Sequence, residues 1–134
     1  MIYALDSNAI IEILKDNTIV LKQRDNVLKQ GNDIIIPIII DYEILRGFYH
    51  RPAPKKEKAY MSFCNLFSIC KLTDEIWKRG ARIYADLRSK GHTIDDFDIL
   101  IAAMCLENGY TLVTHNNKHF DGIDDLLKVD WQDS

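Results

Sequence analysis

The chain has 134 residues and a formal net charge of −3, from 17 Lys and Arg against 20 Asp and Glu. This length fits one domain, and 47% hydrophobic residues supply an apolar core, which excludes a mainly disordered chain and an α/β barrel of about 250 residues. A mildly acidic chain cannot hold nucleic acid by bulk charge, so a polyanionic partner has to be met by a local basic patch or through metal ions.

The cysteines and the apolar runs indicate where such a chain works. The number of cysteines is odd, and none form a CxxC pair; they are Cys64, Cys70 and Cys105. This favours free thiols in a reducing, intracellular setting over a disulfide framework or a zinc site. The N-terminus lacks the basic region of a signal peptide, and no apolar run approaches the ~20 residues that span a bilayer. We therefore expect a cytoplasmic protein with no membrane contact.

The first half of the chain alternates short apolar runs with helical patterns. Apolar residues at helical spacing predict helices, and short β-branched runs predict strands buried on both faces. In chain order we expect a strand at 2–5, a helix capped by Ser7 or Asn8, a helix at 18–30, a strand at 33–38 that ends near Pro37, and a helix at 41–50.

The second half continues this alternation. We expect a helix at 55–67 with Tyr60, Phe63, Leu66 and Phe67 facing inward, a short strand at 68–72, a long helix from 73 to Gly91, a helix at 95–108 closed by Gly109, a strand at 110–114, and in the tail a weak helix and an edge strand with Trp131. Strands that alternate with helices predict one α/β domain over 1–134, with helices on both faces of a parallel sheet. In such sheets functional groups gather at the carboxyl ends of the strands.

Three carboxylates stand at positions where this topology would bring them together. Asp6 ends the first strand, Glu43 follows the second, and Asp98 begins a helix that is apolar almost all round. Each also has an ordinary interpretation, because acids cap helices and favour first turns. Asp95 and Asp96 repel Asp98, and capping accounts for one or two of these three acids. A divalent cation would relieve the repulsion, and oxygen ligands favour Mg²⁺ or Mn²⁺, whose usual chemistry is phosphodiester hydrolysis.

Four segments resemble the PIN-domain ribonucleases, and among them the VapC-type toxins of type II toxin–antitoxin systems. The matching segments are Leu5-Asp-Ser-Asn8, Tyr42-Glu-Ile-Leu-Arg-Gly47, Asp98-Ile-Leu-Ile-Ala-Ala103 and Leu112-Val-Thr-His-Asn-Asn-Lys-His-Phe120. Each is weak alone, but four in the same order are fairly specific. The resemblance implies a three-layer α/β/α PIN-like domain with a short, mostly parallel sheet of about five strands.

The resemblance also implies roles for the acids. Asp6 and Asp98 would bind one or two Mg²⁺ or Mn²⁺ ions, and Glu43 would be a further ligand or would orient the water that attacks an RNA phosphodiester. Ser7 and Asn116 would support the site through hydrogen bonds.

One departure from the family pattern concerns the last segment. Many relatives carry a fourth acid where this chain has Asn116 or His119. Without it a second metal ion would bind more weakly, unless Asp96 or Asp121 supplied the missing negative charge. His119 either contacts a phosphate or packs beside Phe120.

The partners follow from charge and from the same resemblance. A basic stretch around Glu43 would steer RNA, although a solvated helix face explains it equally well; its members are Arg46, Arg51, Lys55 and Lys56. The resemblance implies a homodimer and a cognate antitoxin that inhibits the chain from an apolar groove, which Ile10, Ile13 and Leu14 would help to form, although core packing explains these residues equally well.

Two further functions compete with the metal-dependent endoribonuclease. The same fold with a weak or defective metal site would be an RNA- or protein-binding module. A phosphotransfer domain needs paired acids after the first strand and a late lysine, which Asp6-Ser7 and Thr114-His115 fit poorly, and a phosphatase with an Asp-x-Asp motif is excluded by Asn8.

Overall fold

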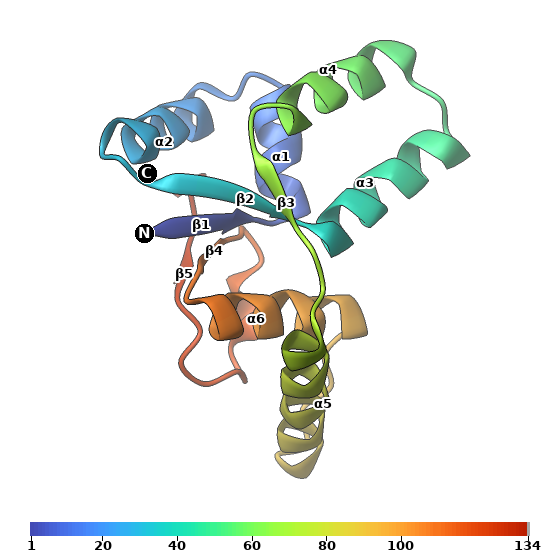
Figure 1. The fold of residues 1–134 in the computed structure, drawn as a ribbon, viewed down its shortest axis with the longest axis vertical. Helices are drawn as coiled ribbons and strands as arrows, with labels where there is room; N and C mark the ends of the chain where they lie inside the picture. The colour runs from blue at the N-terminus through green and yellow to red at the C-terminus, as the bar shows by residue number, and fades with distance from the viewer. Residues whose placement is uncertain (134) are drawn as a thin grey trace.

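One parallel sheet organises residues 1–133, the part of the chain that this computed structural model describes. Its strands are ordered β3-β2-β1-β4-β5, and each neighbouring pair is parallel (Figure 1). The strands are β1 (Ile2–Leu5), β2 (Asp33–Pro37), β3 (Ser68–Cys70), β4 (Thr111–Val113) and β5 (Lys128–Val129).

Helices cover both faces of this sheet, as the sequence predicted. Figure 1 shows α1, α2 and α4 on one side and α6 with α5 on the other, which is a three-layer α/β/α arrangement. The helices are α1 (Ser7–Leu14), α2 (Thr18–Lys29), α3 (Ile38–His50), α4 (Pro54–Cys64), α5 (Asp74–Ser89), α6 (Asp96–Asn108) and the short 3₁₀ turn η1 (Asn117–Phe120). No helix in the described residues is long and apolar enough to cross a membrane.

The core lies on both faces of the sheet, where buried side chains of α1–α4 pack on one side and those of α6 on the other. The side chains of Leu5, Ile36 and Leu112 are fully buried in the three central strands, and α6 is buried along most of its length. Helix α5 packs closely on α6, because Gly80 has no side chain: a Cβ there would lie 3.0 Å from Leu100 Cδ2. This packing fixes α6, and with it Asp98, against the sheet.

The strand register places the ends of three strands at one edge. Leu5 pairs with Val113, and Ala4 pairs with Ile35, so β1, β4 and β2 finish near the same level. The backbone N–H of Asp6 continues this ladder by donating to Val113 O at 2.9 Å. The residues that follow these strands therefore share the carboxyl edge of the sheet.

Several boundaries differ from the sequence prediction. Helix α3 begins at Ile38, three residues before the expected start, because Pro37 ends the strand and acts as the N-cap residue. Asp6 is the N-cap of α1, where Ser7 or Asn8 was expected. Helix α4 ends at Cys64, so Leu66 does not face inward and is 75% exposed.

The tail differs as well. Residues 121–133 contain β5 and no helix, so the weak helix expected there is absent from the described residues; the last residue of the predicted tail, 134, lies outside them. Trp131 follows the edge strand instead of belonging to it. Its ring is 3% exposed and lies 6.1 Å from the ring of Tyr3, which anchors the tail to β1.

Candidate functional site

Asp6 is fixed at the carboxyl end of β1 by two hydrogen bonds. Its Oδ1 accepts from the backbone N–H of Ser7 at 2.8 Å, and its Oδ2 accepts from the hydroxyl of Thr114 at 2.7 Å. The residue is only 6% exposed. Asp6 is thus both a helix cap and a rigidly held carboxylate, so the two interpretations of its sequence position hold together.

Thr114 is the functional candidate that sequence reasoning missed. It follows β4, is 1% exposed, and its Oγ1 accepts from the backbone N–H of Asn116 at 3.0 Å while its hydroxyl donates to Asp6. Asn116 therefore supports the site through its backbone. The available signal was a hydroxyl residue directly after a buried strand, at the same edge of the sheet as Asp6.

Glu43 and Asp98 approach Asp6 from two different helices. Burial is the main cause that raises the pKa of both carboxyls, and the charge of Asp6 is the next cause for each. Asp98 also raises the pKa of Glu43, whereas Arg46 lowers it. The three carboxylates are therefore within electrostatic reach of one another, at the end of β1, in the second turn of α3 and in the first turn of α6.

His119 extends from η1 toward Asp98. Its Nδ1 lies 3.5 Å from Asp98 Oδ2, and its proximity lowers the pKa of Asp98. The imidazole is largely exposed, whereas Phe120 is buried. Of the two roles considered for His119, the structure thus places it beside the acidic centre and not in the packing around Phe120.

The remaining acids differ in how close they lie to the acidic centre. Asp95 is at the N-cap position of α6 without a side-chain bond to the helix, and its charge raises the pKa of both Asp98 and Glu43. Asp96 is exposed and lines neither of the pockets described below. Asp121 pairs with Lys128 at 3.3 Å. Asp95 is thus the nearer additional acid, although the sequence favoured Asp96 or Asp121.

Two pockets lie on either side of this acidic centre. The first, of about 320 Å³, includes Asp98, and its lining residues are His92, Thr93, Ile94, Asp95, Asp98, Lys118, His119 and Gly122. The second, of about 400 Å³, includes Glu43, and its lining residues are Ser7, Ile11, Glu43, Ile44, Arg46, Gly47, Phe48, Arg51, Ala53 and Lys56. The acids therefore stand between two recesses in the surface.

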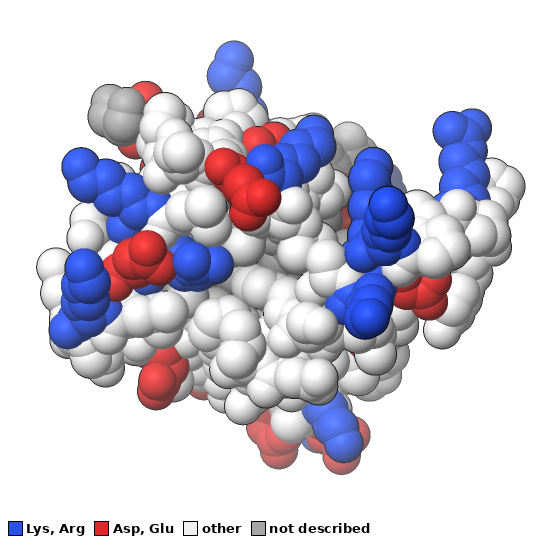
Figure 2. Space-filling view, turned by 90° about the horizontal axis from the view of Figure 1, so that it is seen from above, with Lys and Arg blue, Asp and Glu red and all other residues white. Residues whose placement is uncertain are grey.

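The basic residues expected near Glu43 surround the second pocket. Arg46, Arg51 and Lys56 line it, and Lys55 joins Lys56 along an adjoining groove of about 460 Å³. Figure 2 shows Lys and Arg gathered over the side of the molecule where Figure 1 places α3 and α4. A chain with negative net charge thus carries a positive surface next to its acidic centre.

The donor set fits a hard divalent cation in its chemistry. All three central groups are carboxylates, and the repulsion that raises the pKa of Glu43 and Asp98 would be relieved by a cation. Within residues 1–133, no group of three His, Cys, Asp or Glu side chains is already arranged as a closed metal cage. Magnesium keeps several waters and uses only one or two carboxylates, so it does not require such a cage.

A further polar atom near the start of α1 has no partner. The side-chain oxygen of Asn8 is buried and accepts no hydrogen bond in the described structure. Asn8 lies two residues after Asp6. A donor such as an ordered water would satisfy it, which is a usual feature of solvated polar sites.

Comparisons with known proteins agree with this geometry. The PIN domain family model matches residues 3–126. Ribonuclease VapC1 of Methanocaldococcus jannaschii is 31% identical over 120 residues, covering 88% of this chain and 86% of that protein. The solved structure of VapBC-1 from nontypeable Haemophilus influenzae superposes with a TM-score of 0.88 at 25% identity, covering 98% and 99% of the two chains. VapBC-5 of Mycobacterium tuberculosis, described as a member of the VapBC family of toxin–antitoxin systems, has a TM-score of 0.71 at 15% identity over 96% of both chains and shares the fold.

Proposed function

The chain belongs to the PIN domain family, and from this premise we propose that it is a metal-dependent endoribonuclease, the toxin of a toxin–antitoxin pair. The observation that carries this proposal is the convergence of Asp6, Glu43 and Asp98 at the carboxyl edge of the sheet, where each raised pKa has the charge of Asp6 among its causes. The relative with 31% identity is named a ribonuclease, which supports the same activity.

In this proposal the three acids have different roles. Asp6 and Asp98 would hold one or two Mg²⁺ or Mn²⁺ ions, with Glu43 as a further ligand or as the group that orients the attacking water. A bound ion would supply an activated water and neutralise charge on the phosphodiester. Thr114 keeps the Asp6 carboxylate in one orientation through its 2.7 Å hydrogen bond.

The RNA backbone would enter from the side of the second pocket. Arg46, Arg51 and Lys56 line this pocket together with Glu43, so a phosphate chain held by them passes the acidic centre. Because the acids repel polyanions, the local cations are needed to bring RNA to them. This arrangement supports an RNA substrate despite the net charge of −3.

The adjoining groove supports an antitoxin partner. It is formed mainly by apolar side chains of α1, α3 and α4, with lysines at its rim; its lining residues are Ile11, Leu14, Lys15, Ile44, Phe48, Lys55, Lys56 and Ala59. Of the residues expected there from the sequence, Leu14 does line it, whereas Ile10 and Ile13 are buried in the core. An amphipathic segment with acidic flanks fits this surface.

Two further expectations stay predictions. One is a homodimer, which sedimentation over a range of concentrations would test. The other is location in the cytoplasm, which fractionation of cells that express the protein would test.

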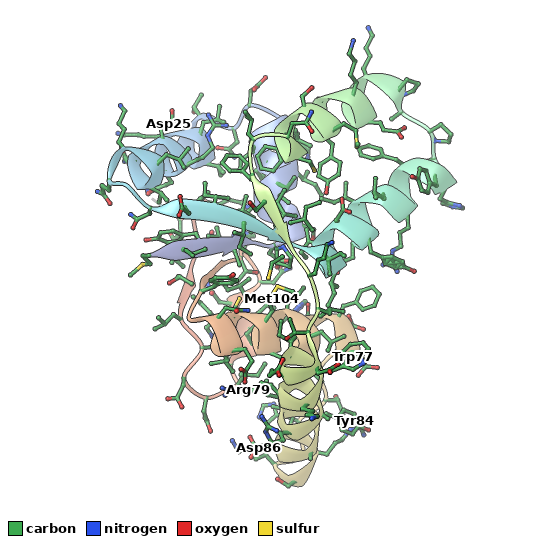
Figure 3. The ribbon with its side chains drawn as sticks, viewed as in Figure 1. Asp25, Trp77, Arg79, Tyr84, Asp86 and Met104 are labelled. Carbon is green, nitrogen blue, oxygen red and sulfur yellow. The ribbon has the colours of Figure 1, made fainter. Side chains whose placement is uncertain are left out.

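The deciding experiment is an RNA cleavage assay with Mg²⁺, with Mn²⁺ and with EDTA. We expect the wild type to cut RNA only with metal, and Asp98→Asn to lose at least about 100-fold in rate, because a direct ligand is removed. Asp25→Asn, which removes an exposed carboxylate on α2 far from α6 (Figure 3), should cut like the wild type. Cleavage in EDTA, or full activity of Asp98→Asn, would contradict the proposal.

A second candidate function is a binding module that holds RNA without cutting it. The specific observation in its favour is that Asn116 and His119 occupy positions where relatives carry an acid, with His119 already 3.5 Å from Asp98. RNA binding without cleavage in the presence of either ion would support this alternative.

A further inference from the structure

An aromatic pair with an arginine over it lies beside the acidic centre. The rings of Tyr42 on α3 and Phe97 on α6 are 5.5 Å apart between centroids, with their planes at 80°. The guanidinium carbon of Arg46 lies 5.3 Å from the centroid of each ring. These three side chains, called the Tyr42 cluster below, join two helices that each carry an acid.

The chain positions of the two rings tie them to the acids. Tyr42 directly precedes Glu43, and Phe97 directly precedes Asp98. Neighbouring residues on a helix point about 100° apart, so each ring flanks its carboxylate instead of covering it. The charge of Arg46 lowers the pKa of Glu43, which places the guanidinium in the same neighbourhood.

Core packing accounts for only part of the Tyr42 cluster. Phe97 is partly buried and packs against the main core, whereas Tyr42 is 50% exposed. Arg46 forms no salt bridge within residues 1–133. An exposed ring and a guanidinium without a carboxylate partner leave flat, cationic surface available to a ligand.

We propose that the Tyr42 cluster is a stacking platform for an unpaired base of RNA, next to the phosphodiester at the acidic centre. This inference rests on the proposed function for its substrate class. Every base has a π-face, and aromatic rings and arginine planes are the surfaces on which unpaired bases stack. Bases within a duplex have their faces covered, so the platform selects single-stranded RNA or a loop.

Binding without cleavage tests the platform separately from the enzyme. The probe is a short unstructured RNA that carries fluorescein at one end and 2-aminopurine inside, titrated with the full chain in EDTA. We expect Tyr42→Leu and Phe97→Leu to weaken binding at least about fivefold and to reduce the quenching of 2-aminopurine, because one base can no longer stack on these rings. Tyr42→Phe keeps the ring and should bind like the wild type, and circular dichroism identifies any variant that does not fold.

The matched control is a second tyrosine with an arginine over its ring. Arg88 lies 5.0 Å from the ring centroid of Tyr84, which Figure 3 shows on α5, beyond Trp77 and farther from the sheet. Tyr84→Leu should leave the affinity and the quenching unchanged. An equal loss in Tyr84→Leu would overturn the platform, because the effect would not be specific to Tyr42.

Two other results separate this inference from its alternatives. If folded Tyr42→Leu binds RNA normally but changes the sedimentation of the chain, the Tyr42 cluster is a contact between two copies and the platform is wrong. If the wild type binds the probe with ring-dependent quenching yet never cuts RNA with Mg²⁺ or Mn²⁺, the platform stands and the proposed nuclease activity fails.

Discussion

At the scale of single residues, one hydroxyl group is expected to affect both the stability of the chain and the cleavage of RNA. Thr114 is buried, and its hydroxyl is the donor to Asp6 Oδ2. Replacement by valine keeps the shape but leaves that carboxylate oxygen without its partner. We expect Thr114→Val to lower the free energy of unfolding by about 1–3 kcal/mol and to slow RNA cleavage at least about tenfold. Urea unfolding and the cleavage assay measure the two effects.

Thr114→Ser is the control for this prediction. Serine retains the hydroxyl and loses one methyl group, so it should keep most of the cleavage rate. Cleavage at the wild-type rate in the valine variant, together with slower cleavage in the serine variant, would show that the methyl group, and not the hydrogen bond to Asp6, holds the site together.

The raised pKa values of Glu43 and Asp98 predict a particular pH dependence of stability. Both carboxyls hold their protons more tightly in the folded state than at their ordinary values of 4.5 and 3.8. The folded chain therefore binds more protons than the unfolded chain just above these values. This contribution to stability is complete at lower pH and is lost as the pH rises through the raised folded-state values.

Asp98→Asn isolates the part of this effect that belongs to Asp98. In EDTA we expect this variant to gain stability relative to the wild type as the pH rises from about 4 toward neutrality. Urea unfolding at several pH values measures the difference. Millimolar Mg²⁺ should stabilise the wild type at neutral pH and so reduce the gain. A difference that does not change with pH would show that Asp98 titrates as an ordinary surface acid.

The carboxylates of the site were predictable from sequence, whereas the groups around them were less so. Asp6 directly follows β1, Asp98 is in the first turn of α6, and Glu43 is in the second turn of the helix that follows β2, and a parallel sheet brings such positions to one edge. Thr114 can be recognised as a partner of Asp6 only when β4 is known to lie beside β1. The contact between Tyr42 and Phe97 likewise depends on how α3 and α6 cross, which local patterns do not contain.

At the scale of elements, one glycine inside a helix and one at a helix end predict opposite effects for the same substitution. Gly109 ends α6 with φ at 70°, in the left-handed region, whereas Gly47 lies inside α3. An added Cβ meets nothing within 4 Å at either position. Gly109→Ala should therefore destabilise the chain by about 1 kcal/mol, and Gly47→Ala should stabilise it by about 0.5–1 kcal/mol.

Thermal unfolding of the two variants checks this pair. The unfolding temperature should fall for Gly109→Ala and rise for Gly47→Ala. A fall in both would show that Gly47 is needed for a contact of α3 that the free space around it does not reveal.

The prediction of element boundaries was correct where a backbone rule determines them and wrong where packing determines them. Gly109 was expected to close α6, because glycine adopts positive φ without strain, and it does. The strand was expected to end near Pro37, and it does, but the apolar residues after Pro37 gave no sign that α3 begins directly at Ile38. Leu66 was expected inside from helical spacing, but α4 ends before reaching it.

At the scale of the whole molecule, the distribution of charge matters more than its sum. The net charge of −3 opposes RNA binding, yet Arg46, Arg51, Lys55 and Lys56 line the pocket and groove beside Glu43. A phosphate bound in this pocket or groove lies next to these cations, whereas charges farther away than about 10 Å are largely screened at ordinary ionic strength.

This distribution predicts how salt affects RNA binding. Each contact with a phosphate of single-stranded RNA adds about 0.7 to the slope of log affinity against log salt, so replacing Lys55 and Lys56 by glutamine should lower the slope by about 1.4. Lys22 and Lys29 are exposed on α2, away from the pocket and groove beside Glu43. Their double replacement by glutamine makes the same change in net charge and should leave the slope unaltered. Anisotropy titrations in EDTA at several salt concentrations measure both, and equal slopes in the two double variants would show that net charge, and not the basic surface on α4, governs the attraction.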